Sequence, residues 1–137
     1  MNITGLLADA AGDVVERIQR SLVALHNGRR GVGAGVIWES ASNKRTLILT
    51  NHHVVAPGAN LSAEFAGGEM LPVQLIAEDP EIDLALIETP PVQLPAAQVA
   101  DSRQLKVGEL ALAVGHPWGQ RGMVTLGLVS SLSKART

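Results

Sequence analysis

From about residue 21 onward the sequence is a succession of short apolar or alternating runs, each ended by turn-forming residues such as glycine, proline and asparagine. Strands bounded in this way at short intervals are typical of an all-β sandwich or barrel. The chain has no cysteine, so no disulfide can hold such a fold together and its apolar core must do so. With 137 residues, of which 46% are hydrophobic, the chain can bury one ordinary core. We therefore predict an all-β protein of one compact domain, or of one domain and part of another.

Six of these runs are candidates for the strands of a first β-barrel. In order along the chain they are SLVALHN, RRGVGAGVIW, RTLILTN, LSAEF, MLPVQLIAED and IDLALIE. The first two are joined around Asn27-Gly28, a dipeptide that suits the positive backbone dihedrals of a tight hairpin. The third is almost continuously apolar, which indicates burial on both faces. Six short antiparallel strands are enough to close a small barrel.

Changes of pattern divide the chain into four segments. We expect an N-terminal helical segment at residues 1–20, the six-stranded barrel at residues 21–89, a linker at residues 90–108 and the opening strands of an incomplete second β-barrel at residues 109–137. The helix is predicted because apolar residues recur near one helical face, and the linker because prolines crowd its start. The last segment contains only two strand candidates, and an isolated hairpin is marginal in water. We therefore expect further strands from elsewhere to complete it.

The charge distribution argues against a nucleic acid partner, and the N-terminal sequence argues against a secretory signal and a membrane span. Lys and Arg number 11 against 13 Asp and Glu, and no Lys or Arg occurs between Arg45 and Arg103, where acidic residues recur. A basic footprint for phosphate backbones is therefore missing, so we expect no nucleic acid partner. The first twenty residues contain no basic start followed by a long apolar run, so we predict no secretory signal and no membrane span. A cytoplasmic location is the expectation that follows.

Two adjacent histidines, His52 and His53, come directly after the apolar run RTLILTN. A histidine fixed at the end of a buried strand can act as a general base, provided that a carboxylate orients its ring. Asp83 is the best candidate for that carboxylate, because it alternates with apolar residues in the run IDLALIE and would need a partner there. The pattern thus predicts a possible His-Asp pair.

Other interpretations of these residues stay open at the level of spacing. A histidine or an aspartate in a β-protein more often has a structural role than a catalytic one. An adjacent histidine pair also suggests metal binding, but neighbours on an extended strand point to opposite faces and rarely share one ion. We therefore expect neither a metal nor a cofactor.

Five motifs, taken together in their order and spacing, favour the catalytic interpretation of these residues over the structural one. They are GVGAGVIW, LTNHHVV, DPEIDLALIE, LKVGELALAVGHPWG and VTLGLVSS. Together they resemble the amino-terminal half of a trypsin-like serine protease of the HtrA/Deg type, over about residues 15 to 133. The resemblance implies a trypsin-like six-stranded antiparallel barrel plus the first strands of a second barrel, preceded here by a short helix. It also implies serine endopeptidase activity, with polypeptides as substrates.

The resemblance carries specific roles onto two residues. The family pattern T-N-x-H-V falls on residues 50–54, which makes His53 the catalytic base and His52 a variable neighbour expected at the surface. The aspartate of the family's D-x-A motif falls on Asp83, which would hold the ring of His53 in the right tautomer and stabilise its charged form. The resemblance implies no cofactor and no metal.

The nucleophile is the main departure from the family pattern. No G-N-S-G-G-like loop occurs in the sequence, so we expect the chain to supply His53 and Asp83 but not the serine, and the isolated chain to be inactive. The complete enzyme would need the missing part from the same polypeptide or from another chain, and its expected protein partners are a complementing C-terminal half or further copies in a homo-oligomer. An alternative is a noncatalytic, truncated protease-like module that binds a peptide or a partner by strand addition.

Overall fold

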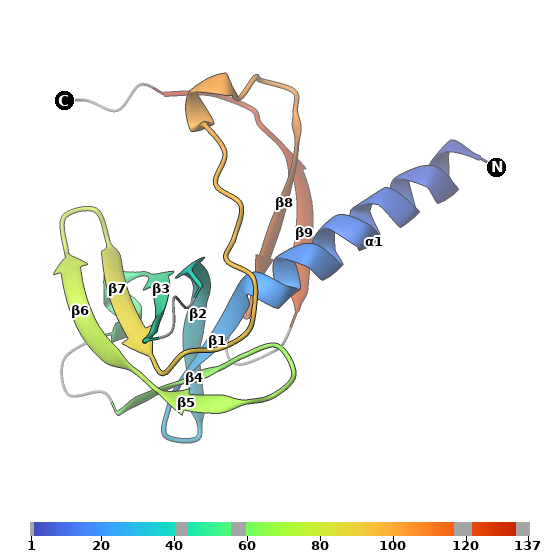
Figure 1. The fold of residues 1–137 in the computed structure, drawn as a ribbon. Helices are drawn as coiled ribbons and strands as arrows, with labels where there is room; N and C mark the ends of the chain where they lie inside the picture. Colours follow the sequence, from blue (N-terminus) through green and yellow to red (C-terminus); the bar gives the residue numbers. More distant parts are fainter. Residues whose placement is uncertain (1, 41–43, 56–59, 117–121, 134–137) are drawn as a thin grey trace.

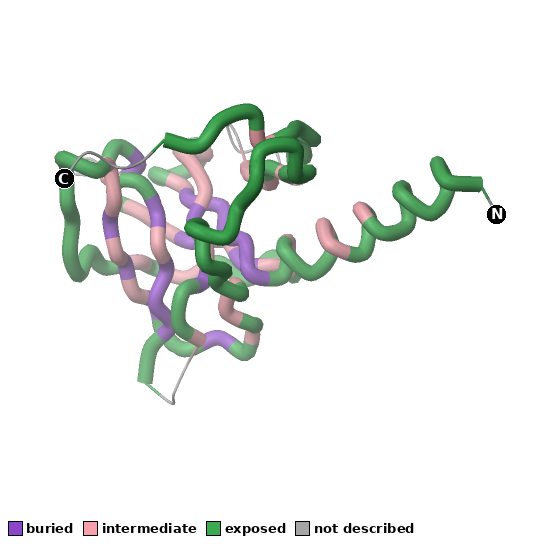
Figure 2. The backbone as a smooth tube through the Cα atoms, turned by 90° about the horizontal axis from the view of Figure 1, so that it is seen from above, coloured by how far each residue is buried: buried purple, intermediate pink, exposed green. Residues whose placement is uncertain are grey.

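The computed structural model describes residues 2–40, 44–55, 60–116 and 122–133. Figure 1 shows a curled antiparallel sheet, a helix that projects from it and a separate two-stranded hairpin. The helix, α1, spans Ile3–Ser21, and Asn2 caps it by accepting a hydrogen bond from the N–H of Gly5 at 2.7 Å. Most of α1 is exposed, and its N-terminal part points away from the sheet in both the ribbon view (Figure 1) and the tube view (Figure 2). Its last residue is buried, so only the C-terminal end of α1 is anchored in the barrel.

Seven strands form the main sheet, in the order β5-β4-β1-β2-β3-β7-β6. Their bounds are β1 Leu22–Asn27, β2 Arg30–Glu39, β3 Thr46–Thr50, β4 Leu61–Glu64, β5 Met70–Pro72, β6 Gln74–Asp79 and β7 Leu84–Thr89. The two outer strands of this order, β5 and β6, are consecutive in sequence and are separated only by Val73. The N–H of Val73 donates to the carbonyl of Leu61 at 3.3 Å. The sheet therefore curls until its two edges meet in one interrupted strand.

This arrangement confirms the predicted all-β class and the small antiparallel barrel. The predicted strand MLPVQLIAED is divided into β5 and β6, because its first half pairs with β4 and its second half pairs with β7. The hairpin expected around Asn27-Gly28 joins β1 to β2, and Gly28 has a φ of 60°. That left-handed conformation suits glycine because it has no Cβ.

The core lies inside the curled sheet, where buried segments gather along the strands in Figure 2. Its largest fully buried apolar side chains are Phe65, Leu25, Ile37, Ile48, Ile87 and Val23. Each such side chain contributes about 1.5–3 kcal/mol of hydrophobic stabilisation when it leaves water. Since the chain has no disulfide, this core is the main source of stability for the barrel.

Two glycines of β2 allow close packing beneath the site described below. A Cβ at Gly33 would lie 2.7 Å from Cγ2 of Val54, and a Cβ at Gly35 would lie 2.5 Å from Cγ2 of Ile48. Both distances are shorter than a normal van der Waals contact, so no larger residue fits without displacement. The short helical turn η1, His52–Val55, which contains Val54, can therefore rest directly on β2.

The segment after β7 is a connection, but it does not hang free. Val92 is buried, and its N–H donates to the hydroxyl of Thr46 at 3.0 Å. Three further hydrogen bonds attach the segment: Ser40 Oγ to Leu94 O at 2.7 Å, Ser21 Oγ to Pro95 O at 2.9 Å and Ala97 N to Ile37 O at 2.8 Å. The prolines at its start thus lead into a stretch that is held against the barrel, and not into a flexible linker.

The last described strands are β8, Leu110–Gly115, and β9, Met123–Leu128, which pair with each other as an antiparallel hairpin. A short helical turn, η2, Ser102–Gln104, precedes them. Several large apolar side chains of this hairpin are exposed, among them Leu110, Leu126 and Leu128. No helix in the described parts of the chain is both long and apolar enough to cross a membrane.

Candidate functional site

The site is built where β3 ends. The hydroxyl of Thr50, the last residue of β3, donates to the carbonyl of Ala34 in β2 at 2.8 Å, which fixes the end of the strand. The N–H of Val54 then donates to the carbonyl of Asn51 at 3.1 Å and closes the turn η1. Val54 and Val55 are buried, so their apolar side chains anchor η1. The preceding two histidines are left nearer to solvent.

The alternation of Asp83 with apolar residues predicts that it lies within a strand. The structure places it outside β7, which begins at Leu84. It is the last residue of the turn between β6 and β7, and its φ is 54°. The turn is tied by a hydrogen bond from the N–H of Glu81 to the carboxylate of Asp79 at 3.1 Å. Since β7 begins only at Leu84, the carboxylate of Asp83 is not set into an apolar strand face, and its side chain is 46% exposed.

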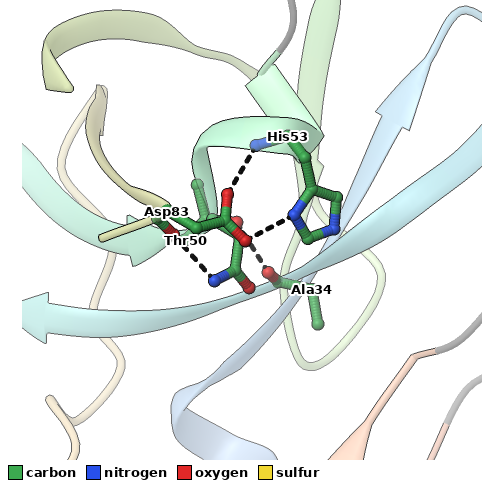
Figure 3. Close-up of polar contacts among 5 residues, drawn as sticks. Ala34, Thr50, His53 and Asp83 are labelled. Carbon is green, nitrogen blue, oxygen red and sulfur yellow. Dashed lines mark hydrogen bonds and ion pairs between the residues drawn. The ribbon is translucent and has the colours of Figure 1, made fainter. Parts of the chain in front are cut away.

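His53 and Asp83 meet through two hydrogen bonds, shown in Figure 3. Oδ2 of Asp83 lies 2.7 Å from Nδ1 of the His53 ring, and Oδ1 accepts from the backbone N–H of His53 at 2.9 Å. With Nδ1–H donating to the carboxylate, the other ring nitrogen, Nε2, is the basic one. The His53 side chain is 70% exposed, so a reacting group can reach that nitrogen.

The electrostatics of the pair favour an ionised carboxylate. The pKa of Asp83 is lowered, chiefly by the backbone hydrogen bond from His53 and then by the hydrogen bond from its ring. Partial desolvation opposes this shift, and the charges on His53 and His52 add to it. A carboxylate that stays ionised next to Nδ1 can stabilise a positive charge on the ring when Nε2 takes up a proton.

His52 differs from the surface neighbour that the motif led us to expect. Its ring Nδ1 lies 3.0 Å from Oε2 of Glu78 in β6, and its side chain is 29% exposed, less than that of His53. Sequence reasoning missed Glu78, because its approach to His52 depends on the pairing of β6 with β7, which places Glu78 opposite Ala85. Nothing in the local sequence around either residue indicates that contact.

The described site offers no obvious place for an ion. Within the described parts of the chain, no group of three His, Cys, Asp or Glu side chains could hold a metal. His52 and His53 bind different carboxylates, Glu78 and Asp83, so they do not converge on a common point. What the arrangement can do chemically is to accept a proton at an exposed, oriented imidazole.

Comparison with known proteins gives one family match and several relatives. Residues 33–137 match the family described as trypsin-like peptidase domain. The periplasmic serine endoprotease DegP of Salmonella typhimurium is 34% identical over 105 residues, which are 76% of this chain and 22% of the relative. The periplasmic pH-dependent serine endoprotease DegQ of Escherichia coli is 35% identical over 106 residues, 77% of this chain and 23% of that protein. A probable periplasmic DegP-like serine endoprotease of Pseudomonas putida is 37% identical over 108 residues, 79% of this chain and 21% of that protein.

The relatives are much longer than this chain, and their names give a cellular location. The chain spans about a fifth of the length of the curated relatives it matches. All three are named as periplasmic proteins, so the cytoplasmic location expected from the first twenty residues is wrong. That expectation rested on the first twenty residues alone, and the names of the relatives overturn it.

Proposed function

Because the chain belongs to the trypsin-like serine proteases of the HtrA/Deg type, we propose that the complete protein is a serine endopeptidase to which these residues contribute two members of the triad. His53 is the general base and Asp83 orients it. The serine lies outside this sequence, which contains no G-N-S-G-G-like loop. The proposal divides the chain into a helical segment at 1–20, a first barrel at 21–89, a connection at 90–108 and the opening strands of a second barrel at 109–137.

The geometry of the pair is the observation that carries this proposal. One carboxylate oxygen is 2.7 Å from Nδ1 of His53 and the other accepts the backbone N–H of the same residue. Two contacts from one carboxylate fix both the position and the tautomer of the ring, which is what a base in acyl transfer requires. An ion pair with a purely structural role has no need of an imidazole whose second nitrogen is exposed.

The reaction then follows the acyl-transfer sequence. Nε2 of His53 takes the proton from the serine hydroxyl as the oxygen attacks the peptide carbonyl, and the ring passes that proton to the departing amine. Water, activated by the same nitrogen, hydrolyses the acyl-enzyme and restores the serine. Asp83 stays ionised throughout, in keeping with its lowered pKa.

Location and partners follow from the relatives. We propose that the protein acts in the periplasm on polypeptides, as the names of its relatives state for those proteins. The part that carries the serine belongs to the same polypeptide or to a complementing C-terminal half, and the protein assembles with that half or as a homo-oligomer. Each of these arrangements brings a glycine-rich serine loop to the exposed side of His53.

Two measurements test the proposed function. The intact mass of the gene product in its source cells tells whether residues follow Thr137, and an assay with unfolded casein tells whether that product cleaves peptide bonds. We expect cleavage that is lost in His53→Ala and kept in His52→Ala, a matched control at the adjacent histidine. Cleavage that survives His53→Ala would refute the assignment. A product that ends at Thr137, does not cleave and binds peptides would support the noncatalytic module instead.

A further inference from the structure

Asp83 has an unusual backbone. Among the described residues other than glycine, it alone has a positive φ, 54°. An L-residue in this left-handed region brings its Cβ close to the following carbonyl oxygen; aspartate adopts the region more readily than most residues, and neighbouring groups stabilise it further. The hydrogen bond of its own N–H does little, because the carbonyl of Pro80 lies 3.4 Å away. The carboxylate of Asp83 is bonded to His53 and Leu84 pairs with Asp79, and one further group bonds the carbonyl of Asp83 itself.

Asn51 provides that group. Its side-chain Nδ2 donates to the carbonyl oxygen of Asp83 at 2.9 Å. The carbonyl oxygen of Asn51 accepts the N–H of Val54 at 3.1 Å and so begins the turn that carries His53. One residue thus joins the turn of His53 to the turn of Asp83, although the histidine and the aspartate are 30 positions apart in the sequence.

The hydrogen bond from Asn51 to Asp83 is not part of the ladder between β3 and β7. The pairing of β3 with β7 extends from Thr46 opposite Thr89 to Thr50 opposite Ala85. The bond from Asn51 to Asp83 lies one step beyond the last of these pairs, and the contact is exposed. The ladder does not need it, because five residue pairs already hold the two strands together. The bond therefore ties the carbonyl of Asp83 to the residue that begins η1, outside the β3–β7 ladder.

We propose that Asn51 is a positioning residue, which holds Asp83 in its left-handed conformation and thereby aims both carboxylate oxygens at His53. Without the amide, the carbonyl of Asp83 loses this partner, the peptide between Asp83 and Leu84 is held only by the pairing of Leu84 with Asp79, and φ of Asp83 relaxes towards negative values. The carboxylate then no longer reaches the ring and the backbone N–H of His53 together. The proposal rests on the proposed function for its catalytic meaning, but its structural content can be tested without any activity.

The test is a solution NMR measurement on the isotope-labelled chain. The one-bond Cα–Hα coupling of Asp83 reports the sign of its φ, and the Nδ1 proton and nitrogen shifts of His53 report the bond to the carboxylate. The variants are Asn51→Ala and Asn51→Asp, the second of which keeps the shape of the side chain but has no N–H to donate. Asn60→Ala is the matched control, because it removes another exposed asparagine side chain.

The expected result is a positive φ for Asp83 in the parent chain and in the control. In both Asn51 variants, the coupling should change to that of a negative φ and the low-field Nδ1 proton of His53 should disappear, while the amide signals of the sheet persist. Unchanged coupling and an unchanged Nδ1 proton in the variants would overturn the proposal. So would a negative φ in the parent chain, or collapse of the whole sheet in both variants, which would make Asn51 a structural residue.

A kinetic measurement separates this proposal from the proposed function. In the complete protease, Asn51→Ala should lower kcat on the order of tenfold to a hundredfold and change KM little, because a misplaced base affects the chemical step. If cleavage survives His53→Ala, the proposed function fails, and the NMR result still decides the role of Asn51. If His53→Ala abolishes cleavage but Asn51→Ala leaves kcat unchanged, only the positioning role fails.

Discussion

Nδ1 of His52 lies 3.0 Å from Oε2 of Glu78, so the histidine next to His53 has a carboxylate of its own. The two adjacent rings therefore bind acidic residues on different elements, Glu78 in β6 and Asp83 in the turn before β7. This division keeps His52 away from the carboxylate that His53 needs. It also attaches the turn η1 to the strand that closes the barrel.

The His52–Glu78 pair should contribute little to global stability. Both side chains are partly exposed, and ion pairs of this kind are usually worth less than about 1 kcal/mol. Urea denaturation of His52→Ala and Glu78→Gln should show losses within that range, and the double variant should lose little more than either single one. A loss of several kcal/mol would mean that the pair is a main support of the barrel.

Asp83 should make stability depend on acid pH in a defined direction. Its pKa in the folded chain is lower than in the unfolded chain, so its contribution is complete above the ordinary aspartate value, about 3.9, and is lost as the pH falls through the lowered value. The stability difference between the parent and Asp83→Asn should therefore shrink between about pH 5 and pH 2. Asparagine tolerates the left-handed region, so the backbone is a matched control. A difference that grows on acidification would contradict this assignment.

Gly35→Ala should strain the barrel where β2 meets β3. The added Cβ would lie 2.5 Å from Cγ2 of Ile48 and 3.3 Å from the carbonyl oxygen of Leu49. Overpacking of this kind costs about 1–3 kcal/mol, which thermal or urea unfolding would measure. Gly127→Ala in β9 is the control, because no atom lies within 4 Å of a Cβ there. Equal stabilities of the two variants would show that β2 moves aside freely.

Thr46→Val should loosen the start of the connection after β7. The hydroxyl of Thr46 is fully buried and accepts the N–H of Val92, which would be left without this partner. An unpaired buried N–H costs about 1–3 kcal/mol. Hydrogen exchange at the Val92 amide should speed up in this variant and stay slow in Thr125→Val, where the threonine is exposed. Unaltered exchange would show that other bonds hold the segment.

The barrel could be predicted from the sequence because local patterns determine most of it. Alternating apolar residues and the Asn27-Gly28 turn specify strands and one hairpin, and both are present. The split of the fifth strand was not predictable, since it depends on which neighbours its two halves find after the sheet has curled. Pro72, the last residue of β5, has no N–H for the ladder and is a local signal for an interruption, but it does not tell which strand each half pairs with.

The residues of the candidate site could be predicted from family motifs, but the backbone conformation of Asp83 could not. The motif at residues 50–54 identified His53 and the D-x-A motif identified Asp83, both by resemblance, and the structure brings their side chains together. The conformation of Asp83 was not predictable, because alternation with apolar residues extends one position beyond the true start of β7. The turn before β7 is bonded to residues distant in sequence, such as Asn51 and His53, and the local pattern carries no sign of those contacts.

The bonded stretch after β7 limits how far the residues that follow it can move from His53. Residues 92–97 are bonded to the barrel, so the connection to β8 leaves the barrel only after Ala97 and not at Pro90. A shorter tether confines whatever follows it to a smaller volume and so raises its effective concentration. A catalytic group that follows Ala97 in the chain would therefore stay closer to the barrel, and would encounter His53 more often, than one carried by a tether that began at Pro90.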